Sequence, residues 1–366
     1  MKTGIVTLYY GNRNYGGNLQ AYALCRVLND MGHEAKVVSY CNNSRAHYIL
    51  SSVKQYVLSL KNDTSRKIKT RKKALKTFNE SIPHTKLYFP ETISKVNKYF
   101  DCFIVGSDQV WNPDWINVYN SLGFVEDGKR KISYAASIGK TILTDSQLDI
   151  LKKVLDRMDR ISIREKENLT LLKGVTDKSI EVALDPTLLF DREEWDEIAS
   201  DRMIADEYIF CYFLRDDKKL REIAREYASS KGLKIVTLPY LNERFGECDK
   251  DFGDHRLFNV SPKDFISLVK YSSFVITDSF HAAVFSHVFG REFIVSSKKG
   301  NEMGCRLKSL TELFGTENRY LNDHDLLTPE YLNNLEKIPF VIKKEKYSEL
   351  KERSLTFLKE AIGNDR

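Results

Sequence analysis

The sequence predicts an α/β protein of two domains, each built around a parallel β-sheet. Short apolar runs of β-like composition alternate with stretches of helical periodicity along most of the chain. The length of 366 residues exceeds what one compact core usually supports. The alternation is interrupted by a polar passage over 185–195 and then restarts, which indicates a second domain.

Composition excludes several classes of protein. Hydrophobic residues make up 42% and charged residues 30% of the chain, which is typical of a globular protein and not of a disordered one. No apolar run reaches about 18 residues, so we expect no transmembrane helix. The six cysteines are far apart, which argues against a zinc site and indicates a reduced protein. Because the first ten residues do not resemble a signal peptide, we expect a cytoplasmic location.

The net charge of +6 is concentrated in one region. Residues 51–100 hold 12 Lys or Arg against 3 Asp or Glu. Nucleic-acid-binding proteins usually spread positive charge over a whole face, so we expect no nucleic-acid partner. Two interpretations of the basic stretch 61–76 stay open: a solvated helix face, or a peripheral contact with anionic lipid at the inner face of a membrane. Apolar residues lie just before it, at Tyr48, Ile49, Val53, Tyr56, Val57 and Leu60.

The first half of the chain begins with a Rossmann-type unit. It consists of a strand over 4–10, a glycine-rich turn, a helix over 18–31 and a strand over 34–40. Residues 47–80 form a basic helical insert, broken near Asn62. The remaining strands are predicted over 100–105, 131–136, 160–163 and 181–184, and the helices over 144–158 and 168–173.

The second half repeats this alternation. Strands are predicted over 208–214, 234–238, 274–277 and 292–295, and helices over 218–231, 262–271, 279–289, 305–314 and 345–362. We therefore divide the chain into an N-terminal Rossmann-like domain over 1–190, which includes the insert 47–80, a C-terminal Rossmann-like domain over 191–340, and a C-terminal helix within 341–366 that could cross back to the first domain. In this architecture the ligand is expected in a cleft outside the carboxyl ends of the strands.

Two polar segments of the first half follow predicted strands. Gly16, Gly17 and Asn18 place backbone N–H groups at the start of a helix, which favours an anion. The alternative is a tight turn that needs glycine. Asp108, Gln109 and Trp111 lie in a loop dense in hydrogen-bonding groups, which predicts substrate contact; the alternative is a plain turn.

The segment 277–283 is the strongest candidate site in the sequence. Asp278 and Ser279 have the chemistry of a helix N-cap, and His281 falls in the first helical turn. Because the positive end of a helix dipole disfavours the imidazolium form, His281 suits a general acid or base, or an anion binder. The alternative is a structural histidine, which is how we interpret His287.

Three cations are further candidates to contact a ligand. Arg164 ends a strand, Arg306 begins a helix, and Lys298 precedes that helix. An arginine can hold a carboxylate or a phosphate through two parallel hydrogen bonds. Arg164 has an alternative, because it can pair with Glu165 or Glu167.

Short motifs across about 3–315 together resemble the polysaccharide pyruvyl transferase family. They are Tyr-Gly-Asn at 10–12, Gly-Gly-Asn-Leu-Gln at 16–20, Val-Gly-Ser-Asp-Gln-Val-Trp-Asn-Pro at 105–113, Ser-Ile-Gly-Lys at 137–140, Ser-Ile-Arg-Glu at 162–165, Leu-Asp-Pro-Thr at 184–187, Thr-Asp-Ser-Phe-His-Ala at 277–282 and Gly-Cys-Arg at 304–306. The resemblance implies two Rossmann-like domains of the GT-B type and transfer of a pyruvyl group from phosphoenolpyruvate onto sugar hydroxyls as a ketal.

The resemblance also implies roles for particular residues. It makes His281 and Arg164 the catalytic candidates, and Asp278, Ser279, Arg306 and Lys298 the donor-site candidates. Gly16, Gly17, Asn18, Asp108, Gln109 and Trp111 become candidates for the acceptor or an anion. Many members carry Arg-Leu-His where this chain has 279–281, so Arg306 or Lys298 is expected to supply the missing cation.

We expect phosphoenolpyruvate as the donor substrate, a sugar as the acceptor, which could be lipid-linked, and neither a cofactor nor a metal. Two alternatives stay open. One is a GT-B glycosyltransferase that uses a nucleotide sugar, because a helix N-terminus also binds a diphosphate. The other is a glycan-binding protein without catalytic activity.

Overall fold

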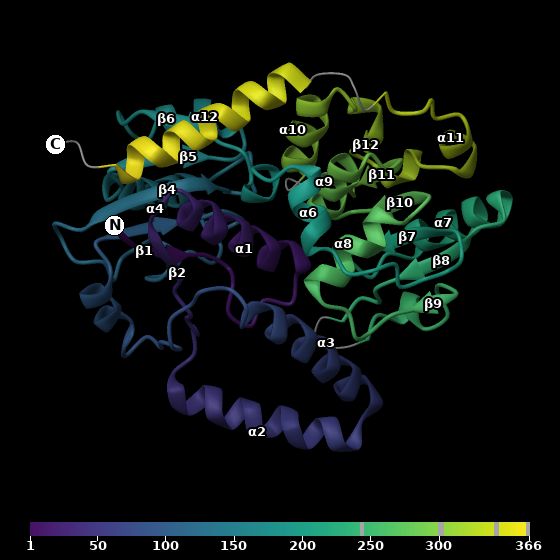
Figure 1. Cartoon of the computed structure of the whole chain (residues 1–366), viewed down its shortest axis with the longest axis horizontal. Coiled ribbons are helices and arrows are strands. Elements are labelled where there is room, and N and C mark those ends of the chain that lie inside the picture. The colour runs from purple at the N-terminus through teal and green to yellow at the C-terminus, as the bar shows by residue number, and fades with distance from the viewer. Residues whose placement is uncertain (242–244, 299–303, 340–343, 364–366) are drawn as a thin grey trace. The chain divides into compact units, whose positions relative to one another are not determined.

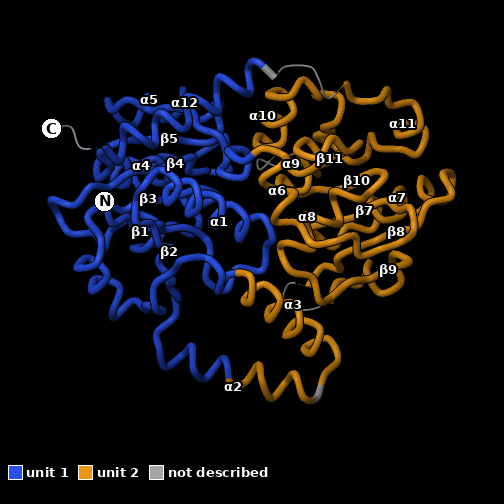
Figure 2. Tube along the Cα trace, viewed as in Figure 1, with its two compact units in different colours: residues 1–52, 79–190, 345–366 blue, residues 53–78, 191–344 orange. Residues whose placement is uncertain are grey.

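The computed structural model describes residues 1–241, 245–298, 304–339 and 344–363. The chain divides into two compact units (Figure 2). Unit 1 comprises Met1–Ser52, Asn79–Phe190 and Glu345–Arg366, and unit 2 comprises Val53–Phe78 and Asp191–Lys344. Each unit contains one six-stranded sheet, so the predicted α/β class with two Rossmann-like units is confirmed.

The sheet of unit 1 has the order β2-β1-β3-β4-β5-β6, and all its strands run parallel. The chain moves outward from β1 to β2 and then crosses to β3 on the other side of β1, so the strand order reverses between β1 and β3. Ligands of open α/β sheets bind at such a point, outside the carboxyl ends of the strands. The strands are β1 (Lys2–Val6), β2 (Glu34–Val37), β3 (Cys102–Val105), β4 (Arg130–Ala136), β5 (Arg160–Ile163) and β6 (Ile180–Val182).

The helices of unit 1 surround a core of aliphatic and aromatic residues from β1, β3, β4 and β5. They are α1 (Tyr15–Asp30), α4 (Asp145–Asp156), α5 (Asn168–Lys173) and α12 (Lys344–Ile362), with short 3₁₀ helices at Ile93–Tyr99 and Pro186–Leu188 (Figure 1). The predicted strand over 4–10 ends at Val6, because the backbone turns there and the N–H of Tyr9 bonds the carbonyl of Thr7.

Unit 2 repeats this topology with the order β12-β11-β10-β7-β8-β9. All its strands are parallel, and the order reverses between β7 and β10. The two edge strands, β9 and β12, are short and are not among the strands predicted from the sequence. The strands are β7 (Tyr208–Tyr212), β8 (Lys234–Thr237), β9 (His255–Arg256), β10 (Phe274–Thr277), β11 (Phe293–Ser296) and β12 (Tyr320–Leu321).

Most helices described in unit 2 begin at a side-chain cap. Asp191 and Ser261 form capping boxes with Glu194 and Asp264, so the polar passage over 185–195 runs into a helix of unit 2. The helices are α6 (Arg192–Ile198), α7 (Lys218–Lys231), α8 (Pro262–Lys270), α9 (Phe280–Phe289), α10 (Cys305–Phe314) and α11 (Pro329–Asn333), with 3₁₀ turns at Glu247–Asp249, Glu317–Arg319 and His324–Leu326.

The basic insert forms two helices, α2 (Arg45–Lys61) and α3 (Asp63–Asn79), and the predicted break near Asn62 is confirmed. We expected the whole insert in the N-terminal domain, but Val53–Phe78 clusters with unit 2. The reason lies in α3: Arg71 is buried and donates to the carbonyls of Pro239 and Leu257, at 2.7 and 3.0 Å.

The C-terminal helix α12 clusters with unit 1. Its Ser354 hydroxyl accepts a hydrogen bond from the N–H of Leu184 at 3.0 Å, and its Phe357 ring lies near that of Tyr134. The chain therefore returns to its first unit through a helix whose apolar face is buried there.

Candidate functional site

Each unit carries a polar cluster at the point where its strand order reverses.

The start of α1 is held by a group of asparagines. The side chain of Asn14 caps the helix and accepts from the N–H of Gly16 at 2.9 Å. Asn18 is buried, donates to the carbonyl of Asn14 and accepts from the side chain of Asn79, both at 2.8 Å. A Cβ atom at Gly17 would overlap the amide of Asn12. Gly16 and Asn18 thus have partners within the protein, and anion binding by this turn stays a prediction.

The loop after β3 is built into unit 1 by Ser107. The Ser107 N–H donates to Gln20 Oε1 at 3.1 Å, and its hydroxyl lies 3.1 Å from Asp185 Oδ2. Gly106 has a φ of +124°, and a Cβ atom there would collide with the carbonyl of Tyr134. Asp108 follows at a φ of +67°, so the backbone turns sharply at the carboxyl end of β3.

Asp108 and Gln109 lie beside this turn. The Asp108 carboxylate accepts from the N–H of Gln109 at 2.9 Å, and Gln109 packs against Gly139. Trp111, however, is fully buried in the core of unit 1. Trp111 therefore contributes to the core of unit 1, and its contact with the acceptor stays a prediction. The exposed indole of this loop belongs to Trp115, which donates to the carbonyl of Gln109 at 2.9 Å.

Arg164 lies at the end of β5 in a buried ion-pair network. Its guanidinium donates to Asp185 at 2.7 Å and to Glu165 at 3.2 Å. Burial would lower the pKa of Arg164, but the carboxylates of Glu165, Asp185 and Asp108 raise it above its ordinary value. The alternative pairing of Arg164 with Glu165 is therefore present. In this structure the guanidinium forms ion pairs with carboxylates of the protein itself.

Asp185 explains the Leu-Asp-Pro-Thr motif. Its Oδ1 accepts from the N–H and the hydroxyl of Thr187 at 3.0 and 2.7 Å, while Oδ2 faces Arg164 and Ser107. One buried carboxylate therefore connects the segments that follow β3, β5 and β6, and this connection sets the shape of the carboxyl edge of the sheet.

In unit 2 the corresponding point is occupied by Asp278, directly after β10. The N–H of Leu214, which follows β7, donates to Asp278 Oδ1 at 2.7 Å. Burial raises the pKa of the Asp278 carboxyl to about 6, although the Leu214 amide and Arg215 both act to lower it. The residue as a whole is partly buried, at the carboxyl end of β10.

The predicted N-cap at Ser279 is confirmed. Its hydroxyl accepts from the N–H of Ala282 at 3.5 Å, and its own N–H bonds the hydroxyl of Thr277 at 3.0 Å. His281 lies in the first turn of α9 and is 4% exposed. These residues bring a carboxyl, an imidazole and the N-terminus of α9 together at one edge of the sheet.

Three cations lie at this edge or near it, and the sequence reasoning missed one of them. Arg215 is close enough to influence the pKa of Asp278, and it follows β7 in the polar segment Leu-Arg-Asp-Asp, a strand-end signal that could have been used. Lys298 follows β11 and is exposed, and Arg306 is the second residue of α10. The residues between these two, 299–303, lie outside the described residues.

His287 is one turn and a half further along α9. Its ring stacks on Phe314 at 4.1 Å between centroids, and burial lowers its pKa to about 3. Its contacts fit the structural role that the sequence predicts for it.

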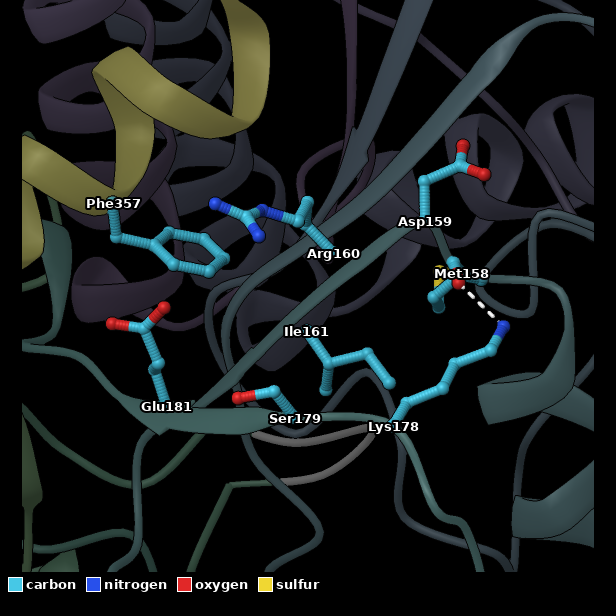
Figure 3. Close-up of a pocket in the computed structure, with 8 residues that line it drawn as sticks. All are labelled: Met158, Asp159, Arg160, Ile161, Lys178, Ser179, Glu181 and Phe357. Carbon is cyan, nitrogen blue, oxygen red and sulfur yellow. Dashed lines mark hydrogen bonds between the residues drawn. The ribbon is translucent and has the colours of Figure 1, made fainter.

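A cavity of about 380 Å³ lies elsewhere, at the amino end of β5 (Figure 3). Its cations have partners: Lys178 donates to the carbonyls of Asp156 and Met158, both at 2.7 Å, and Arg160 pairs with Glu360 at 3.3 Å. The cavity lies at the amino end of β5, whereas ligands of such sheets bind at the carboxyl ends of the strands, so we do not assign the candidate site to this cavity.

Within the described residues, no three His, Cys, Asp or Glu side chains are arranged to hold a metal ion. In the same part of the chain, no helix has both the length and the hydropathy needed to cross a bilayer.

The family model of polysaccharide pyruvyl transferases matches residues 14–297, which include both clusters except Arg306 and Lys298. The chain belongs to the polysaccharide pyruvyl transferase family. No curated protein matches this chain.

Solved structures of UDP-N-acetylglucosamine 2-epimerases share the fold of this pyruvyl transferase family member. A putative epimerase from Listeria monocytogenes is 11% identical with a TM-score of 0.56, over 96% of this chain and 90% of that chain. The Methanocaldococcus jannaschii epimerase, solved in complex with UDP-GlcNAc and UDP, is 15% identical with a TM-score of 0.53, over 98% of this chain and 100% of that chain. At such identities the likeness shows the GT-B-like fold alone.

Proposed function

We propose that this protein transfers the pyruvyl group of phosphoenolpyruvate onto two hydroxyls of a sugar, in a cell-surface polysaccharide or its lipid-linked precursor. The family match over 14–297 supports transfer to a polysaccharide. The observation that carries the donor chemistry is Asp278, a carboxyl with a pKa near 6 beside His281 and the start of α9.

The reaction requires a proton donor. Protonation of the vinyl CH₂ group of phosphoenolpyruvate gives a methyl group and positive charge at C2. One sugar hydroxyl then bonds to C2 and loses its proton, and the second hydroxyl bonds to C2 and loses its proton as the bond from C2 to the phosphate oxygen breaks. One of the two released protons balances that added to the CH₂ group, and the other leaves with phosphate.

Asp278 and His281 are the candidates to hold the moving protons. A group with a pKa near the working pH is the most effective general acid or base, and a carboxyl with a pKa near 6 meets this condition better than an ordinary aspartate. His281 takes the second role, as proton carrier or phosphate contact at the helix start.

The donor carries a carboxylate and a phosphate, so its site needs cations and N–H donors. The first turn of α9 supplies N–H groups, and Arg215, Lys298 and Arg306 supply the charge. Arg215 is a third candidate, beside Lys298 and Arg306, for the positive charge that many family members carry at the position of Ser279.

Unit 1 is the proposed acceptor side. Asp108 and Gln109 lie at the carboxyl edge of its sheet and can accept and donate hydrogen bonds to sugar hydroxyls. Arg164 serves there as a positioning residue, because its ion pair with Asp185 fixes the neighbouring Ser107 loop.

The test is incubation of the full chain with phosphoenolpyruvate and a panel of lipid-linked sugars, read by mass spectrometry for the pyruvyl addition and by release of phosphate. We expect both products, and we expect Asp278→Asn and His281→Ala to lower kcat by at least about 100-fold. His255→Gln, a histidine on the surface of unit 2 paired with Asp206, is the matched control and should keep full activity.

Full pyruvyl transfer by His281→Ala would remove that residue from the mechanism. A parallel thermal-shift comparison of phosphoenolpyruvate with UDP- and GDP-sugars addresses the glycosyltransferase alternative. Stabilisation by a nucleotide sugar and none by phosphoenolpyruvate would contradict the proposed donor.

A further inference from the structure

Helix α2 exposes its apolar residues to solvent. Ile49, Val53, Tyr56, Val57 and Leu60 recur at spacings of three and four, so they form one stripe along the helix. Together with Leu50 and Leu58, they are between 43% and 71% exposed. Soluble helices normally bury such a stripe, so the outward position of this one requires an explanation.

The polar side of α2 is the side that faces the protein. Ser59 is buried and lies 3.4 Å from Lys69 Nζ of α3. Gln55 accepts from Lys72 of α3 at 2.6 Å. The two helices of the pair are labelled in Figure 1. They contact each other through polar groups and leave the apolar stripe of α2 exposed, the reverse of an ordinary helical hairpin.

The charge around the stripe has one sign. Arg45–Asn79 contains ten Lys or Arg and one acidic residue, Asp63, and α2 has no acidic residue at all. Lys54 lies on α2 beside the stripe, and Lys69 of α3 has its Nζ 4.3 Å from the centre of the Tyr56 ring. An apolar face edged by cations is typical of a helix that lies in the interface of an anionic bilayer.

We infer that α2 docks this protein onto an anionic lipid surface, with the stripe inserted among the lipids and the cations of α2 and α3 at the headgroups. A second copy of the chain is a poor occupant, because two such hairpins would bring surfaces of the same positive sign into contact. The inference goes beyond the proposed function and stands on the surface of α2 alone.

The contact that we infer lies mainly on α2, whereas the lipid interpretation left open by the sequence placed it at 61–76. Arg71 is buried against backbone carbonyls of unit 2, and Lys67 lies over the rings of Phe245 and Phe258 at 5.4 and 4.7 Å. These two cations attach α3 to unit 2. Lys69, Lys73 and Lys76 of α3 are exposed.

The test is co-sedimentation of the full chain with vesicles of phosphatidylcholine alone or of phosphatidylcholine mixed equally with phosphatidylglycerol. We expect binding to the mixed vesicles and little to the neutral ones. The stripe variant Ile49→Ser/Val53→Ser/Leu60→Ser should weaken binding at least about tenfold. The charge variant Lys69→Gln/Lys73→Gln/Lys76→Gln should weaken it and reduce its sensitivity to salt.

Two matched controls should bind like the native chain. Ile142→Ser/Leu326→Ser removes exposed apolar residues elsewhere, and Lys153→Gln/Lys231→Gln removes exposed cations elsewhere. Equal binding to both vesicle types, or no loss in the stripe variant, would overturn the inference. So would a dimer in lipid-free sedimentation that the stripe variant converts to monomer, because the occupant would then be a second copy. Failure here leaves the pyruvyl transfer assay unaffected, so the two proposals are tested separately.

Discussion

The guanidinium of Arg164 donates to the carboxylate of Asp185 across 2.7 Å, with both side chains almost entirely buried. The pair joins the end of β5 to the segment after β6, and through Ser107 it also holds the loop after β3. Arg164 neutralises part of a cluster that includes the carboxylates of Glu165 and Asp108. The edge of unit 1 therefore depends on one cation among three acidic groups.

Replacement of Arg164 by methionine should destabilise the protein strongly. The loss of one partner from a buried pair costs about 3–5 kcal/mol, because the remaining carboxylates are left in an apolar setting. Arg26→Met, which breaks the exposed Arg26–Asp30 pair, is the control and should cost less than about 1 kcal/mol. Chemical denaturation measures both. A small loss of unfolding free energy in Arg164→Met would show that the ion-pair network does not stabilise the fold.

Asp278→Asn should stabilise the protein while it lowers activity. The native pKa near 6 lies above the ordinary value of 3.8, so the native state binds the proton more tightly than the unfolded state. Stability therefore falls as the pH rises from 3.8 to 6, and at neutral pH the ionised carboxyl costs on the order of 2 kcal/mol.

The measurement is the free energy of unfolding of the native chain and Asp278→Asn across this pH range. The higher free energy of unfolding of Asp278→Asn should be present above pH 6 and should vanish toward pH 4. If Asp278→Asn is less stable than the native chain at neutral pH, the prediction is wrong. The ionised carboxylate would then stabilise the native state through the hydrogen bond that it accepts from the Leu214 N–H.

His287→Phe should protect the protein from acid. The native pKa of about 3 lies below the ordinary 6.5, so the unfolded state binds the proton more tightly as the pH falls. The stability that the neutral ring provides is present above pH 6.5 and is lost as the pH falls toward 3, by up to about 3 kcal/mol near pH 4. Thermal unfolding at neutral and acidic pH should show a smaller acid effect in the variant. An unchanged pH dependence would contradict the burial of this ring.

Pyruvyl transfer should not need a metal ion. In the function that we propose, Arg215, Lys298, Arg306 and the amides at the start of α9 hold phosphoenolpyruvate, so the protein itself supplies the positive charge. We expect the rate to be unchanged after treatment with EDTA. Loss of activity that magnesium restores would contradict this prediction.

The parts of the fold that depend on neighbouring residues could be predicted. Arg160–Ile163, Lys218–Lys231, Phe274–Thr277 and Cys305–Phe314 have the bounds expected from periodicity, and the cap at Ser279 forms as its side chain predicts. Strand ends were less predictable, as at Val6, because apolar residues continue into the following turn.

The sequence by itself determined the class of fold, the order of its elements and the family, and it indicated the segments that we propose for the site. These follow from local periodicity, capping and motif order, which are all written along the chain. Only the tertiary structure decided that Trp111 is a core residue, that Arg164 pairs with Asp185, that Arg215 lies near Asp278 and that α2 turns its apolar stripe outward. Each of these depends on which distant residues meet, because burial and pairing are properties of three-dimensional neighbours and not of sequence position.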